Sequence, residues 1–163
     1  MKLKPRTQLT LGVAAVTLIV LGIALPRAHS HPQAPPLPRV ALRGAAVTIA
    51  QLHGHAVAIT FFAGWCPGCH TEAAALARFA KNAGADRVIG VAYDDSRSDA
   101  LRLARRSGWS FPLLADPTGS FGAAYGLSNL PTTVIVKSSG EVVTRSFGPE
   151  TVSRLAAQLR YAG

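Results

Sequence analysis

Residues 56–72 read AVAITFFAGWCPGCHTE, and this stretch decides how the rest of the chain is interpreted. The run AVAITFF at 56–62 is continuous, apolar and rich in β-branched and aromatic residues, which is typical of a strand buried on both faces of a sheet. The chain's two cysteines, Cys66 and Cys69, follow it directly, and Pro67 suits the first turn of a helix. The stretch therefore predicts a buried strand that leads into a helix, with both cysteines at the junction.

Two cysteines at this spacing can form a structural disulfide, half of a zinc site or a reversible dithiol. A structural bridge is the weaker interpretation, because so small a loop removes little conformational entropy from the unfolded chain. Zinc also fits poorly, since a closed site needs four ligands and there is no second CxxC. His53, His55 and His70 lie nearby but lack the spacing of a zinc site. The position between a strand and a helix favours redox chemistry.

The start of a helix gives the two cysteines different roles. Unpaired backbone N–H groups and the positive end of the helix dipole stabilise a thiolate there, so we expect a lowered pKa at Cys66. Cys66 is then the attacking nucleophile. Cys69 lies about one turn further along the helix, and we expect it to be more buried and to attack the mixed disulfide that Cys66 forms with a substrate.

The rest of the sequence alternates between strand and helix patterns. Strands are expected at 47–49, 88–93, 112–115, 132–137 and 142–147, the last two joined by a tight hairpin turn. Helical patterns cover 67–83, 98–108 and 149–162, with a short helix or turn at 119–126. Pro149 is expected near the first turn of the last helix. These patterns predict an α/β domain with a central mixed sheet and helices on both faces.

The N-terminus carries basic residues followed by an apolar run. QLTLGVAAVTLIVLGIAL at 8–25 has about the minimum length of a helix that spans a bilayer. We expect residues 1–26 to be a signal anchor, or a signal peptide if cleaved, that leads the chain out of the cytoplasm. Residues 27–39 are predicted to be a proline-rich spacer, and residues 40–163 a domain that faces the periplasm or cell exterior from the bacterial inner membrane.

The net charge of +9 does not by itself indicate a nucleic-acid partner. From Arg39 onward the chain has 13 basic and 8 acidic side chains, and most of the basic ones are scattered. Arg102, Arg105 and Arg106 cluster at helical spacing. We interpret them as a solvated helix face, because no aromatic or groove-reading pattern accompanies them, and we expect no nucleic-acid binding.

WCPGC after an apolar strand resembles the active site of thioredoxin-fold proteins, and further features resemble the membrane-anchored TlpA/ResA branch of thiol-disulfide oxidoreductases. These features are Glu72, the segments FPLLADPTGSFGAAYGL and LPTTVIVKSSGEVV, and the N-terminal apolar segment with its spacer. The resemblance covers about Val40 to Leu159 and implies a thioredoxin-like fold without a cofactor or metal. It also implies client-protein thiols and disulfides as substrates and a membrane protein as thiol-electron donor.

The same resemblance assigns residues around the cysteines that bind the substrate. It implies a cis peptide bond at Pro131, in a loop opposite the cysteines whose backbone binds an extended substrate through Leu130 and Thr132. Further substrate contacts are implied for three residues of the WCPGC motif, Trp65, Pro67 and Gly68.

Glu72 is interpreted as an acid that transfers or tunes the proton during exchange. It lies three residues after Cys69, on the same helix face. Thioredoxins instead have a strand aspartate at the position that Thr60 occupies here. The alternative is an exposed glutamate that is favoured in the first turn by the helix dipole.

The sequence leaves several functions open. The resemblance favours reduction of client disulfides, with roles in cytochrome c or oxidase biogenesis, and a disulfide oxidant or isomerase is the alternative within the same chemistry. The Pro-Gly pair between the cysteines differs from the commoner Gly-Pro or Glu-Pro, and GLSNLPTT replaces the GVxGxPET of cytochrome c maturation members. A copper-handling module that uses Cys66, Cys69 and His70 is the alternative from another class, since thiolates favour Cu(I).

Overall fold

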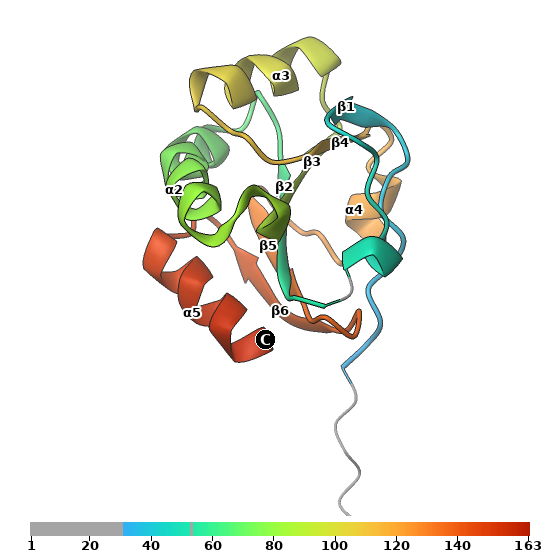
Figure 1. Ribbon diagram of the computed structural model, residues 1–163. Helices are drawn as coiled ribbons and strands as arrows, with labels where there is room; N and C mark the ends of the chain where they lie inside the picture. The colour runs from blue at the N-terminus through green and yellow to red at the C-terminus, as the bar shows by residue number, and fades with distance from the viewer. Residues whose placement is uncertain (1–30, 53) are drawn as a thin grey trace, which may run out of the picture. The chain divides into compact units, whose positions relative to one another are not determined.

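The computed structural model describes residues 31–52 and 54–163, so the predicted membrane segment, the first residues of the spacer and His53 lie outside it. In the described part, no helix has both the length and the apolar character needed to cross a membrane. Six strands form one mixed sheet in the order β1-β4-β3-β2-β5-β6 (Figure 1). They are β1 (Ala41–Arg43), β2 (Val57–Phe62), β3 (Val88–Tyr93), β4 (Leu113–Asp116), β5 (Thr132–Val136) and β6 (Val142–Phe147).

β2 lies in the middle of the sheet, between β3 and β5. It pairs in parallel with β3 and antiparallel with β5, where Thr60 lies opposite Thr133. All six residues of β2 are buried, which explains why its sequence is continuously apolar rather than alternating. The predicted α/β architecture with a central mixed sheet is confirmed.

Helices cover both faces of this sheet. They are η1 (Ile49–Leu52), α2 (Pro67–Ala83), η2 (Ala85–Arg87), α3 (Arg97–Arg106), α4 (Ser120–Ala124) and α5 (Val152–Ala162). One core cluster packs residues of α2, α3 and α5 against the sheet, and a second packs Leu37, Leu52 and Tyr125 against the other face. Figure 1 shows α2 and α5 on one side of the sheet and α4 on the other.

Helix α2 forms over the residues that the sequence predicts. It begins at Pro67, a residue suited to a first turn because it lacks an N–H group, and its N-cap is Cys66. Its buried face includes Ala73, Leu76 and Ala80, at the three- and four-residue spacing of a helix packed on a core. Gly84 follows with a φ of 106°, which L-residues rarely adopt, and ends the helix.

The strand predicted at 47–49 is wrong. The chain turns there and enters the 3-10 helix η1. Both the N–H and the hydroxyl of Thr48 donate to Oε1 of Gln51, at 2.8 and 3.1 Å, and such local hydrogen bonds compete with strand pairing. The strand that precedes β2 is β1, which pairs antiparallel with β4.

The last helix begins later than predicted. Thr151 is its N-cap and accepts a hydrogen bond from the Arg154 N–H at 3.3 Å, so the first helical residue is Val152. Threonine is a favoured N-cap because its side chain satisfies an otherwise unpaired N–H group. Pro149 therefore lies before the helix rather than in its first turn, and Glu150 lies in the connection from β6 to α5.

The described part of the predicted spacer is packed on the domain instead of standing apart from it. The Ala34 N–H donates to the Gly140 carbonyl at 2.8 Å, and the Val142 N–H donates to the Pro32 carbonyl at 2.9 Å. The Tyr125 hydroxyl donates to the Pro35 carbonyl at 2.6 Å. Proline favours extended backbone, and a chain in that conformation can pair with a strand end. The folded unit therefore includes residues before Val40.

Candidate functional site

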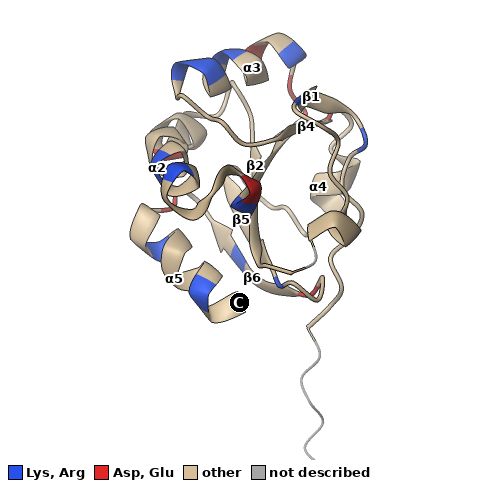
Figure 2. Ribbon diagram, viewed as in Figure 1, with Lys and Arg blue, Asp and Glu red and all other residues tan. Residues whose placement is uncertain are grey.

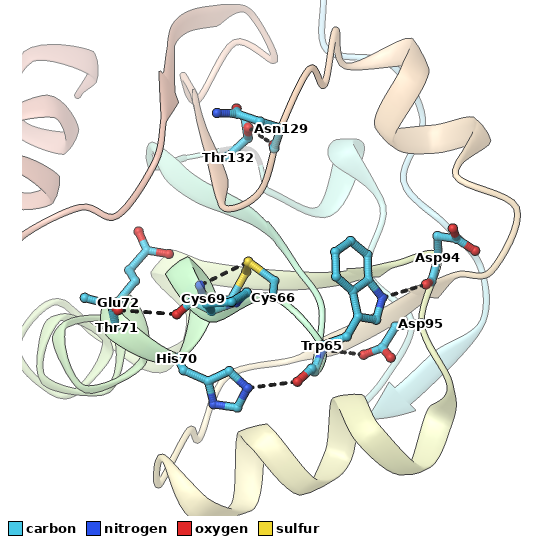
Figure 3. The surroundings of a disulfide bond; sticks show 12 residues. Trp65, Cys66, Cys69, His70, Thr71, Glu72, Asp94, Asp95, Asn129 and Thr132 are labelled. Carbon is cyan, nitrogen blue, oxygen red and sulfur yellow. Dashed lines mark hydrogen bonds between the residues drawn. A yellow bond between two sulfur atoms is a disulfide. The ribbon is translucent and has the colours of Figure 1, made fainter.

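The two cysteines lie where β2 leads into α2 and are joined by a disulfide, with Cα atoms 5.3 Å apart (Figure 3). Both are buried. The N–H of Cys69 donates to Sγ of Cys66 at 3.1 Å. In the reduced protein the same N–H group and the N-terminus of a 17-residue helix would stabilise a thiolate on Cys66. This is the geometry of an attacking thiol with a second thiol one turn away.

The loop that follows β3 holds the turn before the cysteines. The Gly64 N–H donates to Oδ2 of Asp95 at 2.6 Å, and the Trp65 indole N–H donates to the Asp94 carbonyl at 3.0 Å (Figure 3). Nε2 of His70 is hydrogen-bonded to the Gly64 carbonyl at 2.8 Å. Parallel strands β2 and β3 end at the same edge, which brings these residues together. The 58% exposed Trp65 ring is thereby held beside the disulfide.

Gly64 allows α3 to approach this turn closely. A Cβ atom at position 64 would lie 2.8 Å from both Cβ and the carbonyl carbon of Asp99, so backbone would have to move. We expect Gly64→Ala to lower the free energy of unfolding by about 1–3 kcal/mol, the usual effect of overpacking. Chemical denaturation measures this change. An unaltered free energy of unfolding would contradict the close approach of α3.

The loop opposite the cysteines contains a cis peptide bond between Leu130 and Pro131, in agreement with the resemblance. Gly68 provides space for this loop, because a Cβ atom there would lie 3.0 Å from Cδ of Pro131. The Pro131 carbonyl accepts a hydrogen bond from the Gly148 N–H at 2.8 Å. This bond ties the Pro131 loop to the residues that follow β6.

A pocket of about 400 Å³ adjoins Cys66 and forms a groove between the turn that carries the cysteines and the loop before Pro131. It is lined by four of the five residues predicted to bind the substrate, namely Trp65, Pro67, Gly68 and Leu130. Thr132 does not line it, because its side chain is buried and its hydroxyl donates to the Asn129 carbonyl at 2.7 Å. We refer to this pocket as the client groove.

Sequence reasoning missed four further residues of the client groove, which are Tyr93, Leu127, Ser128 and Asn129. Two signals could have found them. Residues 127–129 directly precede the Leu130–Pro131 bond in the sequence. Tyr93 ends a strand parallel to β2, and ligands of open α/β sheets bind beyond the carboxyl ends of such strands.

Glu72 is only 1% exposed, so the alternative of an exposed first-turn glutamate is wrong. Its Oε1 accepts a hydrogen bond from the Glu150 N–H at 3.0 Å, whereas its Oε2 is buried without a hydrogen-bond partner. Burial raises the pKa of Glu72 to about 7, an effect opposed by this hydrogen bond and increased by the charge of Glu150. Glu72 therefore has the proton affinity of a group that can gain or lose a proton near neutral pH.

Glu150 is a second buried carboxyl group next to Glu72. Its Oε1 accepts a hydrogen bond from the Gln158 amide at 3.2 Å, and its Oε2 lies 3.1 Å from Nε of Arg154. Gln158 also donates to the hydroxyl of Ser146 at 2.9 Å. Sequence reasoning missed Glu150, because the bond to Glu72 joins residues 78 positions apart and no local pattern indicates it.

The side chains of Cys66, Cys69 and His70 do not come together as metal ligands in this structure. Among the residues that the structure describes, no three His, Cys, Asp or Glu side chains come together in a way that could hold a metal ion. Figure 3 shows the His70 imidazole directed away from the two sulfurs, toward the Gly64 carbonyl.

Known proteins resemble this chain in sequence and in structure. The thiol:disulfide interchange protein DsbE of Allochromatium vinosum is 35% identical over 99 residues, which cover 60% of this chain and 54% of that protein. The thiol-disulfide oxidoreductase ResA of Halalkalibacterium halodurans is 30% identical over 105 residues, which cover 63% of this chain and 59% of that protein. The chain thus spans little more than half the length of these relatives.

The crystal structure of a thioredoxin family thiol:disulfide interchange protein from Chlorobium tepidum has a TM-score of 0.73 to this structure at 22% identity. The match covers 83% of this chain and 98% of that chain, and it shows that the fold is thioredoxin-like, as predicted. Residues 21–159 match the Redoxin family model. Because that match includes most of the sequence, the chain belongs to the Redoxin family.

Proposed function

We propose that this protein is a thiol-disulfide oxidoreductase that acts outside the cytoplasm and reduces disulfides in client proteins. The observation that carries the proposal is the Cys66–Cys69 pair, which lies at the N-terminus of α2 and beside the client groove. The relatives in Allochromatium vinosum and Halalkalibacterium halodurans are named for disulfide interchange and thiol-disulfide oxidoreduction, which supports the same chemistry here.

In the proposed reaction, the thiolate of Cys66 attacks one sulfur of a client disulfide. A mixed disulfide forms, and the other client sulfur leaves as a thiolate that takes up a proton. Cys69 then loses its proton and attacks Sγ of Cys66, which forms the Cys66–Cys69 disulfide and releases the second client thiol. The client gains two electrons, and a membrane thiol-electron donor restores the dithiol by the reverse exchange.

Glu72 is the proposed acceptor of the Cys69 proton. It follows Cys69 by three residues on the buried face of α2, and its unpaired oxygen and pKa of about 7 suit proton transfer near neutral pH. A carboxyl group with an ordinary pKa would be ionised at that pH and would be a weaker proton acceptor.

The proposal places the domain on the outer side of a membrane, held there by the apolar segment within residues 1–26. The support is the sequence itself, in which basic residues precede an uncharged run of bilayer-spanning length. Disulfides form and persist outside the cytoplasm, so the disulfide-bonded proteins on which this reaction acts are found there.

The direction of electron flow separates a reductant from the alternative, an oxidant or isomerase. A reductant is expected to have a reduction potential near that of thioredoxin, about −270 mV, and far below the value of about −120 mV found for a strong disulfide donor. Equilibration of the domain with dithiothreitol of known redox ratio measures the potential. A reduction potential near about −120 mV would instead assign this protein the role of an oxidant.

Cys69→Ser is expected to accumulate the mixed disulfide, because Cys66 can attack a client but no second thiol releases it. Incubation with a disulfide-bonded peptide and electrophoresis without reductant would show a covalent adduct that dithiothreitol removes. The matched control is the double variant Cys66→Ser/Cys69→Ser, which should form none. A free Cys66 thiol that forms no adduct would contradict the proposed reaction.

A further inference from the structure

A second pocket shares Trp65 with the client groove. Its volume is about 350 Å³, and it lies between the turn before the cysteines and helix α3. Trp65 and His70 line it from the side of the cysteines, and Arg102 and Arg106 line it from α3. Figure 3 shows His70 on the side of α2 that faces α3. We refer to this hollow as the arginine pocket.

The arginine pocket has an excess of positive charge. Its lining has two arginines, Arg102 and Arg106, and one acidic residue, Asp99, and Figure 2 shows basic residues along α3. Arg102 forms an ion pair with Asp99, and Arg97 donates to the carbonyls of Ala41 and Leu42. The Arg106 side chain, by contrast, makes no hydrogen bond or ion pair with any residue that the structure describes. Its guanidinium therefore has all its donors free for a bound group.

The shape and charge of this hollow select the chemistry of its ligand. A guanidinium presents a planar fork of N–H donors that matches a carboxylate. The exposed Trp65 ring forms the wall between the arginine pocket and the client groove. A polypeptide that lies in the groove with its disulfide at Cys66 would therefore pass Trp65 and bring a neighbouring side chain to Arg106.

We propose that the arginine pocket binds an acidic side chain of the client polypeptide, close in sequence to the client cysteine that Cys66 attacks. The inference rests on the proposed function, because it takes a client protein as the occupant of the groove. A polypeptide is favoured over a nucleic acid or an anionic membrane. The basic residues line a concave site of side-chain dimensions next to the reactive sulfurs, rather than a broad flat surface.

The test uses two short peptides that carry serine in place of cysteine and differ only in having glutamate or glutamine beside it. Calorimetry with the disulfide-bonded protein measures their affinities at low salt, and Trp65 fluorescence reports binding at the pocket. We expect the acidic peptide to bind about tenfold more tightly, with the preference falling as salt is raised. Arg106→Gln should reduce that preference about fivefold, since it removes one charge–charge contact.

The matched control is Arg160→Gln, which removes the same charge from α5, outside the arginine pocket. Equal affinities for the two peptides would overturn the proposal, and so would equal losses in Arg106→Gln and Arg160→Gln. Binding to phosphatidylglycerol vesicles that depends on Arg106, without any preference between the peptides, would assign this face to a membrane and also overturn it.

The peptides have no cysteine, so their binding does not depend on disulfide exchange. Disulfide-containing versions of both peptides, added to the protein with Cys66 and Cys69 reduced, then separate the two proposals. If the serine peptide binds through Arg106 but the disulfide version is not reduced, the proposed function fails and the arginine pocket remains an acidic-peptide site. If both peptides are reduced equally well and bind equally well, the arginine pocket fails and the proposed function remains.

Discussion

Replacement of Cys66 by serine is expected to abolish the reduction of disulfide substrates, with a loss of at least about a thousandfold in rate. A serine hydroxyl is not ionised near neutral pH and is a far weaker nucleophile toward sulfur than a thiolate. Cys69 is poorly placed to replace it, because of the two cysteines only Cys66 lines the client groove and accepts the helix N–H bond, whereas Cys69 lies within α2. The turbidity that develops when insulin is reduced by dithiothreitol in the presence of catalytic protein measures this activity.

The comparison of Cys66→Ser with Cys69→Ser separates the loss of the nucleophile from the loss of stability that both variants share. Both variants lose the disulfide, so a loss of stability common to both is measured by thermal denaturation and subtracted. Cys69→Ser should still complete the first attack, whereas Cys66→Ser should not. If Cys66→Ser instead formed the adduct and Cys69→Ser did not, the assignment of nucleophile and resolving cysteine would be reversed.

Glu72→Gln is expected to stabilise the protein at pH 8 and to leave its stability nearly unchanged at pH 4. Glu72 has a pKa of about 7 in the folded protein, above the ordinary glutamate pKa of 4.5. The folded state therefore favours the protonated form. The wild type then loses stability as the pH rises from the unfolded-state pKa through the folded-state pKa, and the glutamine variant does not. Because one pKa unit corresponds to about 1.4 kcal/mol, the gain above pH 7 is on the order of 3 kcal/mol.

Urea denaturation at several pH values between 4 and 9 measures this effect. Glutamine retains the oxygen that accepts the Glu150 N–H bond, so the comparison isolates ionisation. Glu141→Gln, in the turn between β5 and β6, is the matched control for the removal of a carboxylate. The proposed proton transfer gives a second measurement, in which the pH profile of disulfide reduction changes near pH 7 in Glu72→Gln. A stability difference independent of pH would contradict the raised pKa.

Local patterns predict the parts of the fold whose limits are set by single residues. Helix α2 has its predicted bounds because Pro67 and Gly84 begin and end it through their own backbone preferences. Strand β6 also has its predicted bounds, 142–147. The prediction of a strand at 47–49 was wrong because the side chain of Gln51 accepts a hydrogen bond from the backbone N–H of Thr48. Such a local bond competes with strand pairing, and the apolar pattern of the sequence does not indicate it.

The sequence likewise predicts the residues of the candidate site that belong to local motifs, but not those that come together through long-range contacts. Cys66 and Cys69 are identified by a local motif, and the Pro131 loop by its resemblance to a family. The contacts that give the site its electrostatics are long-range. Glu150 reaches Glu72 across 78 positions, and Asp95 reaches Gly64 across 31. These pairs result from the packing of α5 on α2 and from the parallel register of β2 and β3. No short stretch of sequence predicts that packing or that register.

The segment that packs against the start of β6 also bears on self-association. β6 is an outer strand of the sheet, and an outer strand exposes unpaired backbone groups that can recruit a strand of another molecule. Residues 32–34 occupy the backbone groups of Gly140 and Val142 at the beginning of that strand. Pro32, Pro35 and Pro36 have no N–H to offer, so the segment that covers the edge is itself a poor template for further strands. The proline-rich stretch thus protects this end of the sheet against intermolecular β-pairing.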